Sequence, residues 1–411
     1  MTWVYRPITK TREAGVYMEQ YTEWLNETYE KMVRKLTVQT KRVGTMIPFV
    51  PRNGRYGDLG TPHGLSFWTN GFWPGILWQM YHATGQEIFC EAAKGVEERM
   101  DSALHDFEGL YHDVGFMFMP SAVANYRMTG NDESRRRGMH AATLLAGRFN
   151  MNGNFIRAWN EDDQQGRDVR GYMIVDCLMN LSLLFWASNE SKDPRFARIA
   201  REHANTALKY LVREDGSCNH IANFDPGTGE FLGNLGGQGY SEDSSWSRGQ
   251  GWALYGYALC CRYTGDVTYL DTAKRCAHYC ISNLAVNGWI PTVDFRAPKE
   301  HASKEYAPKE YTTNESARPD TSAGVIIACE LLELAEHVTE YEKKLYFDAA
   351  VNILRACESS YGMWDEEEDA ILGGTSLQYH NDMLSGIPII YGDYFFVEAL
   401  LRLKEKALFI W

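Results

Sequence analysis

The chain has 411 residues, 45% hydrophobic and 23% charged, as expected for a globular protein with a larger core than one small domain provides. Its formal net charge of −13 argues against nucleic acids and anionic membranes as partners, and no apolar run approaches the ~20 residues of a membrane span. The 9 Cys include no Cys-x-x-Cys pair, and no signal-peptide-like segment opens the chain. We therefore expect a cytoplasmic protein with reduced thiols and no metal site.

The N-terminal quarter of the chain reads as helices separated by one loop. Residues 12–45 show helical periodicity, and residues 48–64 are rich in Gly, Pro and Arg, which indicates a loop. From Ser66 an aromatic-rich segment leads into an apolar helix that ends at Gly85, and an amphipathic helix follows from Gln86 to about Leu104.

The same unit recurs along the chain: an apolar helix, a Thr-Gly turn and a charged amphipathic helix. The turns at Gly130 and Gly265 repeat the one at Gly85. Almost no period-two alternation is present, and the loop segment Trp289–Asp294 is compatible with a short strand. About five or six such pairs predict an all-α fold with an inner barrel of buried helices and an outer ring; a helical solenoid would show a more regular period. We expect a single domain over 1–411, with an N-terminal helical and loop segment at about 1–65.

The segment Gly171–Trp186 is apolar nearly all the way round, so it is predicted to be a buried helix with Asp176 in its middle. A buried carboxyl group holds its proton to a higher pH than an exposed one, which suits a general acid. Asn180, one turn further on, would share the face of Asp176 and orient it. The alternative is a structural Asp satisfied by backbone donors.

Two further segments carry candidate site residues. Asp113 lies between glycines before an apolar helix, as a second carboxylate for sugar chemistry or as a helix N-cap. In the Gly-rich loop from Gly236, Arg248 begins a helix and is predicted to bind a carboxylate, while Trp246 and Trp252 would form a stacking wall. A structural ion pair is the alternative for Arg248. His220 is either a core residue whose hydrogen bonds are made within the protein, or part of the same site at the entrance of the barrel.

Several segments together resemble glycoside hydrolase family 88, the unsaturated glucuronyl hydrolases. They are His112–Phe116, Ile174–Leu181, Gln238–Ser241, Ser245–Trp252, Asp320–Ala323 and Tyr391–Leu401. The resemblance implies an (α/α)6 barrel that needs no metal or organic cofactor. It implies Asp176 as the general acid/base and Asp113 as its partner carboxylate. The positions implied to bind substrate are Trp68, His220, Gln238, Trp246, Arg248 and Trp252.

The implied substrate is an oligosaccharide with a 4,5-unsaturated uronic acid at its non-reducing end, left by a polysaccharide lyase. Asp176 would protonate C4 of the enol ether, water would add at C5, and the hemiketal would collapse. Family members that favour sulfated disaccharides resemble one another in a Ser-x-x-Ser-x-Lys segment, where this chain has Gln378, Asn381 and Met383. We therefore expect a preference for unsulfated substrates. The oligomeric state, monomer or homodimer, stays open.

Three alternatives compete with this interpretation. The chain could be an unsaturated rhamnogalacturonyl hydrolase of the related family 105, or a conventional two-carboxylate glycosidase on the same barrel. It could also be a non-catalytic saccharide-binding toroid. The 13% aromatic content, with 12 Trp and 24 Tyr, suits any of them because sugar C–H faces stack on aromatic rings.

Overall fold

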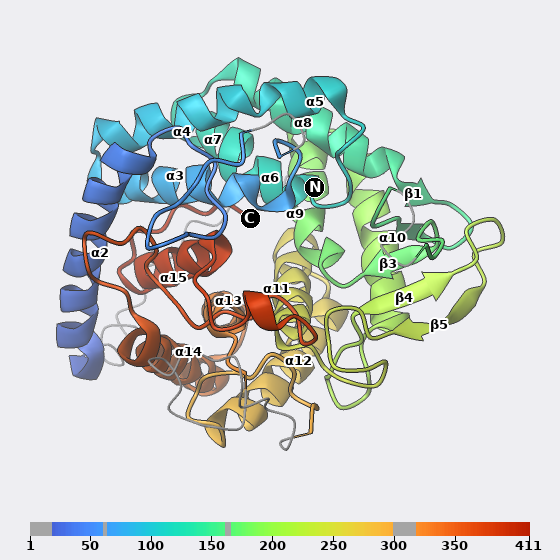
Figure 1. The fold of residues 1–411 in the computed structure, drawn as a ribbon. Coiled ribbons are helices and arrows are strands. Elements are labelled where there is room, and N and C mark those ends of the chain that lie inside the picture. The colour runs from blue at the N-terminus through green and yellow to red at the C-terminus, as the bar shows by residue number, and fades with distance from the viewer. Residues whose placement is uncertain (1–18, 61–63, 161–165, 299–317) are drawn as a thin grey trace.

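The computed structural model describes residues 19–60, 64–160, 166–298 and 318–411 and shows two concentric rings of helices (Figure 1). The inner ring consists of α3 (Phe72–Thr84), the continuous stretch α6 (Val114–Phe118), η3 (Met119–Val123) and α7 (Ala124–Thr129), then α9 (Cys177–Ser191), α11 (Ser247–Thr264), α13 (Thr321–Leu334) and α15 (Ile390–Leu403). The outer ring consists of α4 (Glu87–Arg99), α8 (Asp132–Gly147), α10 (Pro194–Tyr210), α12 (Val267–Ala285), α14 (Glu340–Tyr361) and α2 (Thr22–Val43). Each inner helix packs mainly on the outer helix that pairs with it, so the predicted (α/α)6 barrel is confirmed.

The repeated Thr-Gly turns end inner helices in the way that the pattern predicts. Gly85, Gly130 and Gly265 are the C-caps of α3, α7 and α11, each with a positive φ of about 70° that glycine adopts without strain. After two of these turns, the side chains of Asn131 and Asp266 accept hydrogen bonds from backbone N–H groups of the next outer helix. Short turns of this kind place consecutive helices antiparallel, inner against outer.

The prediction of one helix over Gly171–Trp186 is wrong at its N-terminal part. Residues Tyr172–Ile174 form strand β3, which pairs antiparallel with β4 (Ile221–Phe224), and β4 pairs with β5 (Phe231–Leu235). The helix begins only at Cys177, so Asp176 occupies its N-cap position. A buried apolar run does not distinguish strand from helix, and the partner strand lies some 50 residues away in sequence. The small sheet projects beside α10, and β1 (Phe149–Asn150) pairs with β2 (Phe155–Ile156) nearby (Figure 1).

The core fills the barrel and the space between the rings. Every residue of α13 is buried, whereas the outer helices bury one face only, as in α10. Trp411 is fully buried and contacts Phe116 and Phe395 with its ring. All nine cysteines are buried and free, and no helix in the described part of the chain is long and apolar enough to cross a membrane.

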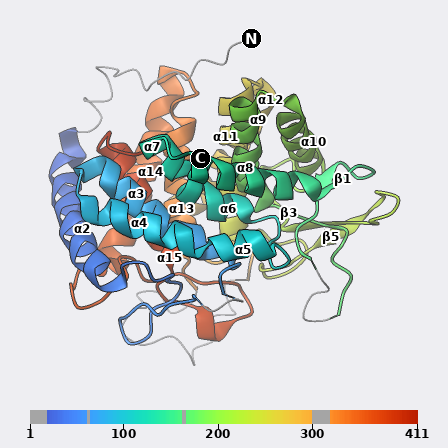
Figure 2. The same ribbon diagram turned by 90° about the horizontal axis from the view of Figure 1, so that it is seen from above.

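The N-terminal segment predicted at 1–65 does not stand apart from the barrel. Helix α2 follows η1 (Glu19–Tyr21) and packs against α4 and α15, completing the outer ring. Residues 1–18 and 61–63 of that segment lie outside the described residues. The shorter helices η2 (Trp68–Gly71), α5 (Asp101–Asp106) and η4 (Asp382–Leu384) lie in the connections. Figure 2 shows the blue loop before α3 and the red segment before α15 at the same end of the barrel.

Candidate active site

The candidate residues gather where inner helices begin. Asp113 directly precedes α6, Asp176 precedes α9, Trp246 precedes α11 and Asp320 precedes α13. Inner helices of this barrel run in the same direction, so their N-termini meet at one end. The positive ends of their helix dipoles favour carboxylates and anionic ligands there.

Asp176 has one oxygen without a protein partner. Its Oδ2 atom accepts no hydrogen bond, and Nε2 of His220 lies 3.5 Å from it. The side chain keeps 17% of its surface exposed, more than Asp113 does. The expectation that Asp176 is buried in the middle of an apolar helix is therefore corrected: it stands at a helix start with part of its side chain exposed, while Oδ2 faces His220 and is buried without a hydrogen bond.

Asp113 is the buried member of the pair, with 8% of its surface exposed. It occupies the N-cap position of α6 without a side-chain capping bond. Its Oδ1 atom instead accepts a hydrogen bond from Asn180 Nδ2 at 3.2 Å, and His112 Nε2 lies 3.4 Å away. Burial, reinforced by the charge of Asp176, raises the pKa of Asp113 well above its ordinary value. This carboxyl group thus retains a proton to higher pH than an exposed Asp does.

Asn180 orients Asp113 rather than the carboxylate of Asp176, contrary to expectation. Its Oδ1 atom accepts from the backbone N–H of Phe116 at 2.8 Å, which leaves Nδ2 to donate to Asp113 and to the backbone carbonyl of Asp176. One amide therefore links the start of α6 to the start of α9. The sequence correctly places Asn180 one helical turn after Asp176. The direction of its side chain, however, is set by the packing of α6 on α9, which the sequence does not show.

His220 is held by the Gly-rich loop through a single backbone contact. The N–H of Gln238 donates to its Nδ1 atom at 2.9 Å, so the proton of the neutral ring lies on Nε2, facing Asp176. The ring of Trp246 lies 4.5 Å from the His220 ring, centroid to centroid. His220 therefore belongs to the mouth of the barrel, and Gln238 reaches it through its main chain.

Arg248 does not present a free guanidinium. It is 1% exposed, it pairs with buried Asp320 at 2.7 Å, and it donates to the carbonyls of Ser376 and Leu377. Gln238 Oε1 accepts a further bond at 3.3 Å. The structure thus favours the structural ion pair, the alternative considered for this residue, over direct contact with a uronate. Arg248 joins three loops of the mouth.

The three candidate tryptophans differ in exposure. Trp68 is half-buried and packs on Tyr391 with the ring centroids 5.2 Å apart, and Trp246 is 3% exposed. Trp252 is fully buried between Phe116 and Phe395, so it offers no face to a sugar and the predicted stacking wall lacks this member. Position 252 faces the core because it lies one and a half turns into an inner helix.

Comparison with known proteins decides the family. The model of Glycosyl Hydrolase Family 88 matches residues 14–285. The chain is 35% identical over 350 residues to the unsaturated glucuronyl hydrolase of Bacillus sp. (strain GL1), covering 84% of this chain and 88% of that protein. The chain belongs to glycoside hydrolase family 88.

A further relative and a solved structure support this assignment to family 88. The unsaturated chondroitin disaccharide hydrolase of Streptococcus pneumoniae is 33% identical, over 84% of this chain and 83% of that protein. The solved structure of the Bacillus sp. GL1 unsaturated glucuronyl hydrolase superposes with a TM-score of 0.82 at 32% identity, covering 93% of this chain and 97% of that one.

One functional neighbour in this family 88 site was not singled out by sequence reasoning. His112 adjoins Asp113, and burial lowers the pKa of its ring to about 3, so it is neutral at physiological pH. A neutral His112 adds no positive charge beside the carboxylate pair. Its place in the quoted motif, next to Asp113, was the available signal. Within the described ranges, no three His, Cys, Asp or Glu side chains converge as metal ligands would.

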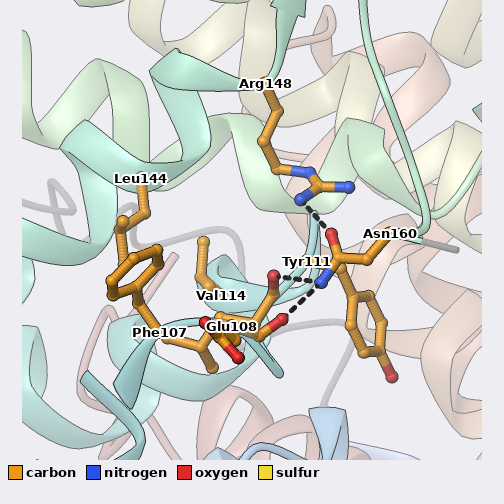
Figure 3. A pocket seen from close by; sticks show the side chains of 8 residues that line it. Phe107, Glu108, Tyr111, Val114, Leu144, Arg148 and Asn160 are labelled. Atoms are coloured by element: carbon orange, nitrogen blue, oxygen red, sulfur yellow. Dashed lines mark hydrogen bonds between the residues drawn. The ribbon is translucent and has the colours of Figure 1, made fainter. Parts of the chain in front are cut away.

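A pocket of about 220 Å³ borders the segment that leads into α6, together with Leu144, Arg148 and Asn160 (Figure 3). Its lining residues are Phe107, Glu108, Leu110, Tyr111, Val114, Leu144, Arg148 and Asn160. Arg148 and Asn160 face each other there and are joined by a hydrogen bond (Figure 3). The candidate carboxylates themselves do not line this pocket.

Proposed function

We propose that the protein hydrolyses 4,5-unsaturated glucuronyl residues from the non-reducing end of lyase-generated oligosaccharides, with Asp176 as general acid/base. The observation that carries the proposal is the pair of carboxylates at the barrel mouth. One of them, Asp113, is buried with a raised pKa, and the other, Asp176, is partly exposed. Membership of family 88 and the activities named for its relatives support the same substrate class.

The pair is suited to holding one proton at neutral pH. Two nearby carboxylates resist double ionisation, and burial of Asp113 strengthens that resistance. Asp176 is the more exposed of the two, so we assign to it the transfer of this proton to C4 of the enol ether. Positive charge then develops at C5 and the ring oxygen, next to a site of net negative charge.

Water completes the reaction. It adds to C5 as the ionised Asp176 accepts one of its protons, which restores the starting protonation state and leaves a hemiketal at C5. The hemiketal opens by breaking its bond between C5 and the ring oxygen, so C5 becomes a ketone and the ring oxygen becomes a hydroxyl on C1. C1 is then a hemiacetal, which collapses to an aldehyde and releases the neighbouring sugar as its linking oxygen takes up a proton. His220, with its proton on Nε2, is positioned to donate a hydrogen bond to the ionised Asp176.

Loss of the ultraviolet absorbance of an unsaturated disaccharide tests this assignment. We expect Asp176→Asn to abolish the loss while the melting temperature stays near that of the wild type, because an amide cannot donate and recover the proton. Asp113→Asn is expected to lower kcat strongly. Normal turnover by Asp176→Asn would refute the assignment. Turnover of a galacturonyl-rhamnose disaccharide in preference to glucuronyl substrates would favour the family 105 activity.

We also propose a preference for unsulfated substrates. The resemblance to the family assigns Gln378, Asn381 and Met383 to the positions of the Ser-x-x-Ser-x-Lys segment in members that favour sulfated sugars. Met383 is 87% exposed and carries no positive charge, so it cannot supply the cation that a sulfate at this position would need. Comparing kcat/KM for matched disaccharides with and without a 6-sulfate tests this. We expect a higher kcat/KM for the unsulfated disaccharide and a smaller difference in kcat/KM between the two in Met383→Lys. A higher kcat/KM for the sulfated disaccharide would contradict the proposal.

A further inference from the structure

Arg148 makes an unusual set of contacts for a charged side chain. It follows the C-terminus of α8, and its guanidinium donates to the carbonyls of Arg157, Ala158 and Trp159 at 2.9–3.0 Å and to Oδ1 of Asn160 at 2.5 Å. No carboxylate of the described residues forms an ion pair with it. The guanidinium of Arg148 therefore binds one short segment of chain, residues 157–160, and holds it against α8.

This segment is in turn bonded to both stretches that carry the candidate carboxylates. The carbonyl of Ala158 accepts from the N–H of His112 at 3.2 Å, and its N–H donates to the carbonyl of Tyr172 at 2.9 Å. His112 immediately precedes Asp113, and Tyr172 begins the strand β3 that leads to Asp176. Ala158 thus bridges the two backbones whose ends bear the carboxylates.

Asn160 adds a second connection to the same loop. Its Nδ2 atom donates to the carbonyls of Glu108 and Leu110 at 2.8 and 2.9 Å, just before the segment of Asp113 (Figure 3). The hydrogen bond from Arg148 to Oδ1 sets the orientation of this amide. The residue after strand β3 is also bonded to the third site residue, because the N–H of Val175 donates to the carbonyl of His220.

We propose that Arg148 is a positioning residue that holds Asp113 and Asp176 at their working separation by fixing residues 157–160 against both backbones. The proposal rests on the proposed roles of the two carboxylates. Arg148 itself touches no substrate in this scheme. A shift of about 1 Å between reacting groups can lower a rate about 100-fold, whereas substrate affinity depends on other side chains.

Steady-state kinetics on an unsaturated disaccharide test this role. We expect Arg148→Met to lower kcat about 100-fold while KM changes little. Arg148→Lys is expected to recover little, because a single ammonium cannot reach four acceptors in a fork. The adjacent pocket borders Arg148, so tens of millimolar methylguanidinium should restore part of the turnover of Arg148→Ala.

Two other variants separate positioning from loss of fold. Arg42→Met removes three guanidinium bonds to Asp369 and Glu368 from α2, on the other side of the barrel, and is expected to lose stability but keep kcat. Asn160→Asp keeps the contact with Arg148 but loses both bonds to the 108–110 loop, and is expected to lower kcat about tenfold at little cost in melting temperature. Near-wild-type kcat in Arg148→Met or in Asn160→Asp would overturn the proposal. Full activity of Asp176→Asn in this assay would instead refute the assigned carboxylates.

Discussion

Gly237 lies so close to His220 that a Cβ atom added to it would stand 1.9 Å from Nδ1 of the ring. Its φ of +57° also disfavours any side chain. We expect Gly237→Ala to push the loop or the ring away, break the bond from Gln238 and lower kcat/KM at least about tenfold. Kinetics on an unsaturated disaccharide measure the effect.

Gly288 offers a matched control for that variant. Its φ is +69°, and an added Cβ would meet nothing within 4 Å. Gly288→Ala therefore imposes a similar backbone strain, about 1 kcal/mol, without a contact at the site. Equal losses of kcat/KM in the two variants would show that strain alone, rather than the position of His220, is responsible.

The Arg248–Asp320 pair is expected to stabilise the fold. Arg248→Met leaves Asp320 buried without its cation, which typically costs about 3–5 kcal/mol in the free energy of unfolding. The double variant Arg248→Met/Asp320→Asn should recover part of this loss, because no uncompensated charge remains. Denaturant unfolding measures both. If Arg248→Met kept its stability and only raised KM, the original interpretation of Arg248 as a uronate ligand would be right.

Alanine substitutions of Trp68 and Trp252 are expected to affect different properties, substrate binding for Trp68 and stability for Trp252. Trp68 is half-buried at the mouth, so Trp68→Ala should raise KM about tenfold, which corresponds to about 1.4 kcal/mol of binding. Trp252 is fully buried, so Trp252→Ala should cost about 3–5 kcal/mol of stability through the cavity it leaves. Melting curves beside KM values separate the two effects, and an unchanged KM in Trp68→Ala would remove Trp68 from the binding site.

Asp393 is expected to make stability depend on pH. Burial raises the pKa of this carboxyl group to about 7, although Tyr56 and two backbone N–H groups donate to it. Between about pH 4 and 7 the folded chain therefore binds a proton that the unfolded chain releases. The contribution of Asp393 to the free energy of unfolding thus falls as pH rises through this range. The slope is at most about 1.4 kcal/mol per pH unit.

Asp393→Asn isolates this contribution. The amide oxygen can still accept the backbone bonds, but it has no proton to lose. Unfolding free energies measured from pH 4 to 8 should therefore fall less steeply in the variant than in the wild type. Parallel curves for the two proteins would contradict the assignment.

The alternation of apolar and amphipathic helices could be predicted from the sequence, because helix periodicity and glycine C-caps are local properties. Asp113 and Asp176 could be proposed for the same reason, because each lies in a short motif next to a helix start, whereas His220 directly precedes strand β4. The strand β3 was missed because its pairing with β4 joins residues far apart in sequence. Periodicity carries no information about such partners.

The order of the helices, the family and the residue types at the barrel mouth were therefore determined by the sequence itself. Tertiary structure alone decided that Trp252 faces the core, that Arg248 is neutralised by Asp320, and that Arg148 ties Ala158 between the two carboxylate-bearing segments. The physical reason is that burial and electrostatic pairing depend on which segments meet in space. A guanidinium looks the same in sequence whether its partner is a substrate or a buried aspartate 72 residues away.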